Sequence, residues 1–171
     1  MKRRIATVSA IALGVALLSV AAAGNSVPLL VWNTTASAPV GFYRVHAADD
    51  FIRGDLVIVL PPTHLASLFA KRGYLPIGVP LLKQVAALSG AVVCRVDLQI
   101  TIDGLAVATA LERDHQGRPL PGWRGCHELA RGEVFLLNTG RPDSLDGRYF
   151  GPVPAALIIG RAEPLWTWTP D

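Results

Sequence analysis

Ser37 stands in the segment NTTASAPVG, residues 33–41, among other hydroxyl residues and close to a proline. Pro39 fixes its own φ angle and favours an extended conformation in the residue before it, so the backbone there should be tightly shaped. A serine held at such a bend can offer its Oγ as a nucleophile and its N–H to a developing oxyanion. Thr35 would face the same side in an extended backbone and supply a second donor. The alternative is a polar linker without chemistry.

Lys83 is the one charge in the apolar run LLKQVAAL, residues 81–88. Burying an unpaired ammonium is costly, so a buried Lys83 would have its pKa lowered from ~10.4 toward neutrality. A neutral lysine amine can accept a proton from a hydroxyl and act as a general base. The alternative is an edge strand whose lysine faces water and discourages aggregation.

A third group lies in the segment NTGRPDSLDGRYFGPV, residues 138–153, where Ser144, Asp146 and Arg148 alternate. An extended backbone would put these three side chains on one face. Asp146 and Arg148 could then form a charge-assisted pair that holds the loop, which leaves Ser144 free to hydrogen-bond and orient a lysine amine. The alternative is a turn rich in Asp, Gly and Pro with an incidental ion pair.

Composition and motifs exclude several other classes of protein. The 171 residues are 51% hydrophobic and 17% charged, which argues against disorder, and the net charge of +3 comes without basic runs. We therefore expect no nucleic-acid partner. The chain contains no glycine-rich phosphate loop, no H-E-x-x-H and no G-x-S-x-G, and its four histidines share no motif. We expect neither a metal nor an organic cofactor.

The elements that must position these residues read mainly as short β-strands bounded by Gly, Pro and Asp. Asp103-Gly104 predicts a two-residue hairpin turn within residues 99–107. Residues 64–72 predict the one short helix, with Thr63 capping its start and Gly73 its end. The segment 118–126 predicts an exposed connecting loop. Further strands are expected at residues 42–45, 55–60, 81–88, 91–96, 133–138 and 157–168.

The N-terminus has the pattern of a membrane segment. MKRR is followed by residues 5–24 without a charge, close to the ~20 residues that cross a bilayer as a helix. Basic residues before the segment favour export of everything after it. Ala21, Ala22 and Ala23 offer the alternative of a cleaved signal peptide. We therefore divide the chain into residues 1–24, an anchor or signal sequence, and residues 25–171, a single all-β, mainly antiparallel domain across the membrane.

The two cysteines fit an oxidising compartment. Cys94 and Cys126 form no CxxC pair and have no metal-ligand spacing. A disulfide between them is the simplest interpretation in the periplasm. The alternative is two separate buried thiols.

Taken in order, these segments resemble the type I signal peptidase family, and most closely its conjugative-transfer (TraF-type) branch. The segments that carry the resemblance are NTTASAPVGFY, GDLVIVL, LLKQVAAL and SLDGRYFGPV, supported by RGYL and GRPLP, so the likeness spans residues 2–168. This sequence has Ser-Ala-Pro where housekeeping signal peptidases have Ser-x-x-Pro. That difference affects the expected oxyanion geometry and the assignment to the housekeeping branch.

The resemblance implies a role for each candidate residue. Ser37 would be the nucleophile and its N–H the main-chain oxyanion donor, with Thr35 as the side-chain donor. Lys83 would be the general base, and Ser144 would position it. Asp146 and Arg148 would form the structural pair behind Ser144. The resemblance also implies a β-rich signal-peptidase-like fold with a hydrophobic surface on the bilayer.

The expected function is a membrane-bound serine endopeptidase of the bacterial inner membrane, with its catalytic domain in the periplasm. It would cleave signal peptides or pilin precursors after small residues, and the conjugative secretion machinery would be a partner. Three alternatives remain, namely a housekeeping signal peptidase, a transpeptidase that cyclises a pilin, and a non-catalytic membrane-tethered scaffold.

Overall fold

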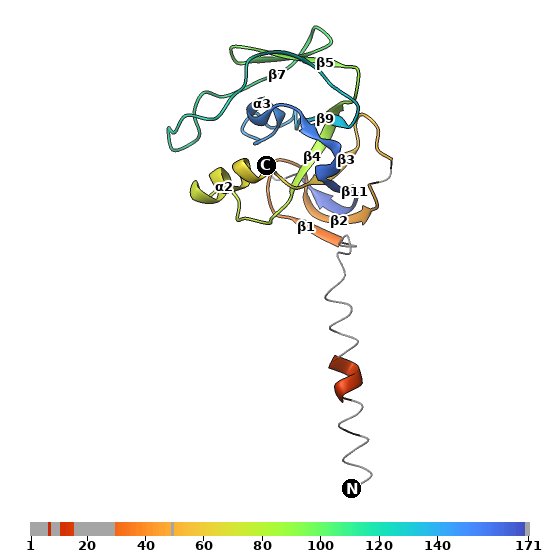
Figure 1. Ribbon diagram of the computed structural model, residues 1–171. Helices are drawn as coiled ribbons and strands as arrows, with labels where there is room; N and C mark the ends of the chain where they lie inside the picture. The colour runs from red at the N-terminus through yellow and green to blue at the C-terminus, as the bar shows by residue number, and fades with distance from the viewer. Residues whose placement is uncertain (1–6, 8–10, 16–29, 49, 170–171) are drawn as a thin grey trace.

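The computed structural model describes residues 7, 11–15, 30–48 and 50–169 of the chain. Its β-strands form two sheets, and short helices lie in the connections between strands (Figure 1). The helices are α2 (Thr63–Lys71), α3 (Gly147–Phe150) and the 3₁₀ turn η1 (Ala155–Leu157). The strands are β1 (Leu30–Asn33), β2 (Val40–His46), β3 (Leu56–Val59), β4 (Leu81–Ala87), β5 (Val92–Val96), β6 (Gln99–Ile102), β7 (Leu105–Thr109), β8 (Gly125–Glu128), β9 (Glu133–Leu136), β10 (Val153–Pro154) and β11 (Ile158–Trp168).

The larger sheet has the strand order β1-β2-β11-β3-β4-β9-β10, and the smaller one has the order β7-β6-β5-β8. Every strand pairing among the described residues is antiparallel. The prediction of a mainly antiparallel β fold is confirmed. The sequence analysis missed β1, β8 and the two-residue β10. β8 begins at Gly125, inside the segment 118–126 that was predicted to be a loop.

The smaller sheet forms one end of the molecule, and β1 and β2 lie at the other end (Figure 1). Its β6–β7 hairpin turns at Asp103 and Gly104, whose φ angles of 51° and 78° are the left-handed values that such a turn requires. Cys94 of β5 and Cys126 of β8 face each other across neighbouring strands and form the predicted disulfide, with an S–S distance of 2.07 Å.

Helix α2 confirms the helix expected at residues 64–72, whereas the short helices α3 and η1 were not predicted. The prediction that Thr63 caps it was wrong, because the carbonyl of Pro62 accepts the first helical hydrogen bonds and no side chain caps the N-terminus. Pro62 suits this place, since proline has no N–H to satisfy and a fixed φ. Gly73 ends the helix with a φ of +71°, as expected.

The predicted membrane segment lies largely outside the described residues. Thr7 and residues 11–15 are helical. Across the part of the chain that the structure describes, no helix has the length and apolar character needed to span a membrane.

Candidate active site

Ser37 lies in a tight turn between β1 and β2 rather than in the extended backbone that we predicted. The buried side chain of Asn33, the last residue of β1, holds this turn together. Its Nδ2 donates to the carbonyl oxygens of Thr35, Ala38 and Pro39 at 2.9, 3.1 and 3.0 Å. One amide side chain thus donates to three turn carbonyls, and the hydroxyl of Tyr43 also donates to the carbonyl of Pro39 at 2.6 Å.

Thr35 is brought to Ser37 by this turn, since their hydroxyl oxygens are 3.1 Å apart. The backbone N–H and the hydroxyl of Thr35 both donate to Asn33 Oδ1, at 3.1 and 3.0 Å. To donate to an oxyanion at Ser37, the Thr35 hydroxyl would therefore have to turn away from Asn33.

Gly41 fixes how the chain leaves the turn. Its φ is +142°, and a Cβ at this position would lie 2.1 Å from the carbonyl oxygen of Trp166 on the neighbouring strand β11. Only glycine allows β2 and β11 to approach this closely. The pairing of β2 with β11 begins at Val40, three residues after Ser37, and anchors the C-terminal side of the turn.

Lys83 is only 2% exposed and lies in β4, between β3 and β9. The alternative of a water-facing lysine on an edge strand was wrong, because β4 is an interior strand. Lys83 Nζ donates a 2.7 Å hydrogen bond to Ser144 Oγ. Burial lowers the pKa of the Lys83 amine to about 8, and Arg148 acts in the same direction, while Asp146 and Asp143 oppose it.

Asp146 and Arg148 form a buried ion pair, as predicted, at 0% and 1% exposure. The guanidinium meets both carboxylate oxygens, with Nε 2.9 Å from Oδ1 and Nη2 2.7 Å from Oδ2. The extended backbone expected here was wrong beyond Asp146. Asp146 instead caps the N-terminus of α3 by accepting from the Arg148 N–H. The next residue must be small, because a Cβ on Gly147 would lie 2.6 Å from the Phe135 ring.

Asn138 joins the two halves of the site, and the sequence analysis did not single it out. Its Nδ2 donates to the carbonyl oxygens of Ser37 and Leu82 at 2.7 and 3.2 Å, and its Oδ1 accepts from the Gln84 N–H at 3.0 Å. Leu82 and Gln84 are the neighbours of Lys83 in β4. Asn138 is therefore hydrogen-bonded to Ser37 and to the residues on both sides of Lys83.

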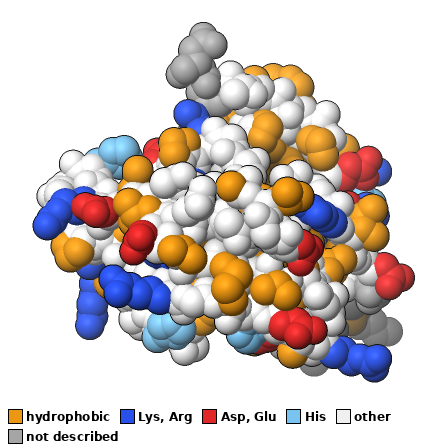
Figure 2. All heavy atoms as spheres, turned by 90° about the horizontal axis from the view of Figure 1, so that it is seen from above, with side chains coloured by type: hydrophobic (Ala, Val, Ile, Leu, Met, Phe, Trp, Pro, Cys, Tyr) orange, Lys and Arg blue, Asp and Glu red, His pale blue; other side chains and the backbone are white. Residues whose placement is uncertain are grey.

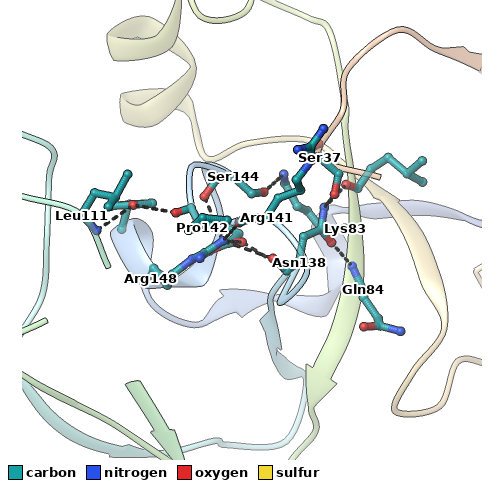
Figure 3. Close-up of polar contacts among 12 residues, drawn as sticks. Ser37, Lys83, Gln84, Leu111, Asn138, Arg141, Pro142, Ser144 and Arg148 are labelled. Atoms are coloured by element: carbon teal, nitrogen blue, oxygen red, sulfur yellow. Dashed lines mark hydrogen bonds and ion pairs between the residues drawn. The ribbon is translucent and has the colours of Figure 1, made fainter. Parts of the chain in front are cut away.

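Arg141 is a second residue that the sequence analysis missed. Its Nε donates to the carbonyl oxygen of Ala36 at 2.7 Å, and its own carbonyl accepts from Arg148 Nη2 at 2.6 Å. The loop that carries Ser144 is thus tied to the turn that carries Ser37. Figure 3 shows Ser37, Lys83, Asn138, Arg141 and Ser144 converging on one site. The only sequence signal for Asn138 and Arg141 was their place in the same segment as Ser144.

Ser37, Thr35, Lys83 and Ser144 line one cavity of about 230 Å³. An adjoining cavity of about 410 Å³ shares Ser37, Thr35 and Lys83 and is otherwise mainly apolar, with Val31, Ile58, Leu75, Val79, Pro80, Leu81 and Leu82 in its wall. Among the described residues, no direct hydrogen bond joins Ser37 to Lys83. The site therefore brings together a serine, a lysine with a lowered pKa and a hydrophobic recess. This combination is suited to nucleophilic attack on an acyl group beside a small apolar side chain.

Residues 2–168 match the family described as signal peptidase, peptidase S26. Among curated relatives, the probable conjugal transfer protein TraF of Sinorhizobium fredii (strain NBRC 101917 / NGR234) is 37% identical over 92% of this chain and 90% of its own length. The plasmid transfer protein TraF of Escherichia coli is 35% identical over 91% of this chain and 92% of its own. The conjugal transfer protein TraF of Agrobacterium fabrum (strain C58 / ATCC 33970) is 36% identical over 81% and 82%.

Among solved structures, a signal peptidase I from Enterococcus faecalis V583 covers 66% of this chain and 97% of its own, with 19% identity and a TM-score of 0.38. The assignment does not depend on that likeness, because the family match spans almost the whole chain and the relatives exceed 30% identity across most of it. The chain belongs to the peptidase S26 signal peptidase family and is homologous to TraF conjugal transfer proteins.

Proposed function

We propose that this protein is a membrane-bound serine endopeptidase in which Ser37 is the nucleophile and Lys83 the general base. The observation that carries the proposal is the burial of Lys83 beside Ser144, in a cavity that Ser37 also lines. A lysine whose pKa is lowered to about 8 is partly neutral near pH 7–8 and can accept a proton. A purely structural role would not require a buried amine next to an accessible hydroxyl.

The reaction follows from these positions. Lys83 Nζ takes the proton of Ser37 Oγ as the oxygen bonds to the scissile carbonyl carbon. The Ser37 N–H and the Thr35 hydroxyl stabilise the oxyanion, and the protonated lysine returns its proton to the leaving amine. Water then repeats the attack on the acyl-enzyme and releases the acid. Ser144 keeps the amine of Lys83 directed into the cavity throughout.

The substrate would be an extended peptide with a small side chain at the cleavage site. The apolar cavity beside Ser37 has room for such side chains, and its wall includes strands β1 and β4. The relatives are named as conjugal or plasmid transfer proteins, so we infer a pilin precursor or another protein of the mating apparatus as substrate. The conjugative secretion machinery would be the partner.

The domain would work in the periplasm, against the surface of the inner membrane. The disulfide between Cys94 and Cys126 suits an oxidising compartment. Exposed aromatic side chains gather on β1, β2 and β11, with Trp32 packed on Phe42 and Trp168 at ring distances of 4.4 and 5.6 Å. At the opposite end, charged and apolar side chains are interspersed (Figure 2). Trp is enriched where proteins meet the membrane interface.

The test is processing of a co-expressed pilin precursor in membranes, measured by intact mass. Wild type should shorten the precursor, and Ser37→Ala and Lys83→Met should each reduce the rate about a thousandfold or more. Lys71→Met and Ser89→Ala change exposed residues away from the cavity and should process normally. The product mass also separates hydrolysis from cyclisation, since a ring weighs one water less than the cut chain. Normal processing by Ser37→Ala would leave residues 33–41 as a linker and exclude this mechanism.

A further inference from the structure

Ser37 borders a third cavity, of about 290 Å³, which Lys83 does not line. Ser37 therefore stands between two differing recesses. The recess on the lysine side is mainly apolar. The third cavity has a mixed lining, in which Leu56 and the turn residues 36–39 lie beside the polar side chains of Gln84, Asn138, Thr139 and Arg141. We call it the polar cavity after these four side chains.

A peptide whose scissile bond lies at Ser37 must run past it in both directions. If the small apolar side chain before the bond occupies the apolar recess, the residues after the bond extend toward the polar cavity. That the small side chain occupies the apolar recess rests on the proposed function. That the residues after the bond extend toward the other cavity rests on the placement of the two recesses around Ser37.

Arg141 sets the charge of the polar cavity. No carboxylate lines this cavity, and Arg141 forms no ion pair with any described acidic residue. Its Nε is fixed on the carbonyl oxygen of Ala36, which orients the guanidinium at 2.7 Å from the nucleophile turn. A half-buried guanidinium that is held in place and has no anionic partner among the described residues is well suited to bind a carboxylate through two parallel N–H···O hydrogen bonds.

We propose that this cavity is the binding site for the leaving segment of the substrate, and that Arg141 selects an acidic side chain within the first residues after the cleaved bond. Gln84 contributes an amide oxygen, since its Nε2 is already bonded to the carbonyl of Gly54. The Gln84 side-chain oxygen can then accept a hydrogen bond from a backbone N–H of the leaving segment of the substrate. The substrate would thus be read as small and apolar before the bond and acidic after it.

The experiment uses the full chain in detergent micelles and a set of internally quenched peptides. All peptides share one acyl half that ends in alanine, and they carry Glu, Gln or Lys at the first or the second residue after the bond. For wild type we expect kcat/KM to fall in the order Glu, Gln, Lys, with about threefold to tenfold between Glu and Lys at one of the two positions. The order should weaken as the salt concentration rises.

The deciding variant is Arg141→Glu, which should reverse the order so that the Lys peptide is cleaved faster than the Glu peptide. It also removes the bond to Ala36, so its absolute rates will fall. The ratio between two peptides on one enzyme is independent of that loss. Arg131→Glu, at an exposed position outside the cavity, is the matched control and should keep the wild-type order.

Equal cleavage of the three peptides by wild type would overturn this inference and leave the proposed function intact. A preference for Glu that survives in Arg141→Glu would also overturn it, because another group would then be responsible. If wild type cleaves none of the peptides and no precursor, the proposed function is wrong and this inference falls with it.

Discussion

The side chain of Asn138 donates a 2.7 Å hydrogen bond to the carbonyl oxygen of Ser37, across 101 positions of sequence. The same side chain is bonded to Leu82 and Gln84 on either side of Lys83. The Asp146 carboxylate in turn accepts from the Asn138 N–H at 3.0 Å. One buried amide thus links the turn that carries Ser37 to the strand that carries Lys83, and the Asp146–Arg148 pair holds this amide in position.

Replacing Asn138 should therefore slow catalysis more than it weakens substrate binding. Asn138→Asp keeps the acceptor for Gln84 and removes the donors to Ser37 and Leu82. We expect kcat to fall about tenfold to a hundredfold with little change in KM, because misplacing the nucleophile affects the chemical step. Stability should fall by about 1–3 kcal/mol, from unsatisfied carbonyls and a buried carboxylate.

Steady-state kinetics and urea unfolding measure both effects, at a temperature where the variant is folded by circular dichroism. Gln99→Ala, an exposed position in the smaller sheet, serves as control. An unchanged kcat in Asn138→Asp would show that the loop does not position the turn.

The pH dependence of activity should report Lys83. Because only the neutral amine accepts a proton, kcat/KM should rise with pH through a midpoint at about 8. The exposed carboxylate of Asp143 raises the pKa of Lys83, so Asp143→Asn should move the midpoint to lower pH. Asp50→Asn, an exposed carboxylate that is not among the groups acting on Lys83, should leave it unchanged. If the midpoint of Asp143→Asn equals that of wild type, a group other than Lys83 controls the pH profile.

Lys83→Met should stabilise the folded protein while abolishing activity. Folded Lys83 releases its proton at about pH 8 and an unfolded lysine at ~10.4. Between these values the unfolded state binds more protons, so stability rises with pH. The lowering of the Lys83 pKa from 10.5 to about 8 destabilises the folded state at pH 7 by about 3 kcal/mol, which Lys83→Met should relieve. Loss of the hydrogen bond to Ser144 in this variant should offset about 1 kcal/mol of that gain.

We thus expect Lys83→Met to be about 2 kcal/mol more stable than wild type at pH 7 in chemical denaturation. The gain should disappear above about pH 10.5, where the lysine is neutral in both states. Lys71→Met should show no such pH-dependent gain. A destabilised Lys83→Met at pH 7 would contradict a strongly lowered pKa.

Removing the disulfide should affect stability and leave catalysis unchanged. Cys94 and Cys126 join β5 to β8 within the smaller sheet, outside the cavities around Ser37. Replacing both by serine should cost about 2–4 kcal/mol, and kcat/KM should be retained below the unfolding temperature. Thermal unfolding of the variant and of wild type with and without reductant measures this. Loss of activity without loss of structure would connect the smaller sheet to the site.

The aromatic cluster on β1, β2 and β11 should contact lipid. In vesicles that contain brominated lipids, fluorescence from Trp32, Trp166 and Trp168 should be quenched. Trp123 is partly buried against Phe135, donates to the carbonyl of Gly147 and lies outside this cluster, so its fluorescence should be unaffected. Trp166→Phe should therefore reduce the quenched fraction, and Trp123→Phe should increase it. Equal quenching in both variants would exclude this orientation.

Several parts of the molecule could be predicted from the sequence because the signal for them is local. Alternation of apolar residues located most strands, Asp103-Gly104 located the hairpin and Gly73 located the end of α2. The Cys94–Cys126 bridge followed from count and compartment. Thr63 was wrong as a cap because Pro62 occupies the N-cap position. β1 and β8 were missed because LVWN and GCHE lack the run of branched apolar residues that marks the four-residue strands β3 and β9.

The sequence by itself determined which residues are candidates for the chemistry, because residue type sets what a hydroxyl, an amine or an ion pair can do. Only the tertiary structure decided that Lys83 is buried, since exposure depends on which strands flank β4. The structure also decided the bridging position of Asn138 and the place of Arg141, whose Nε donates to the carbonyl of Ala36 and which forms no ion pair among the described residues. These features depend on contacts between segments some 50 to 100 residues apart, and such contacts have no local signature in the chain.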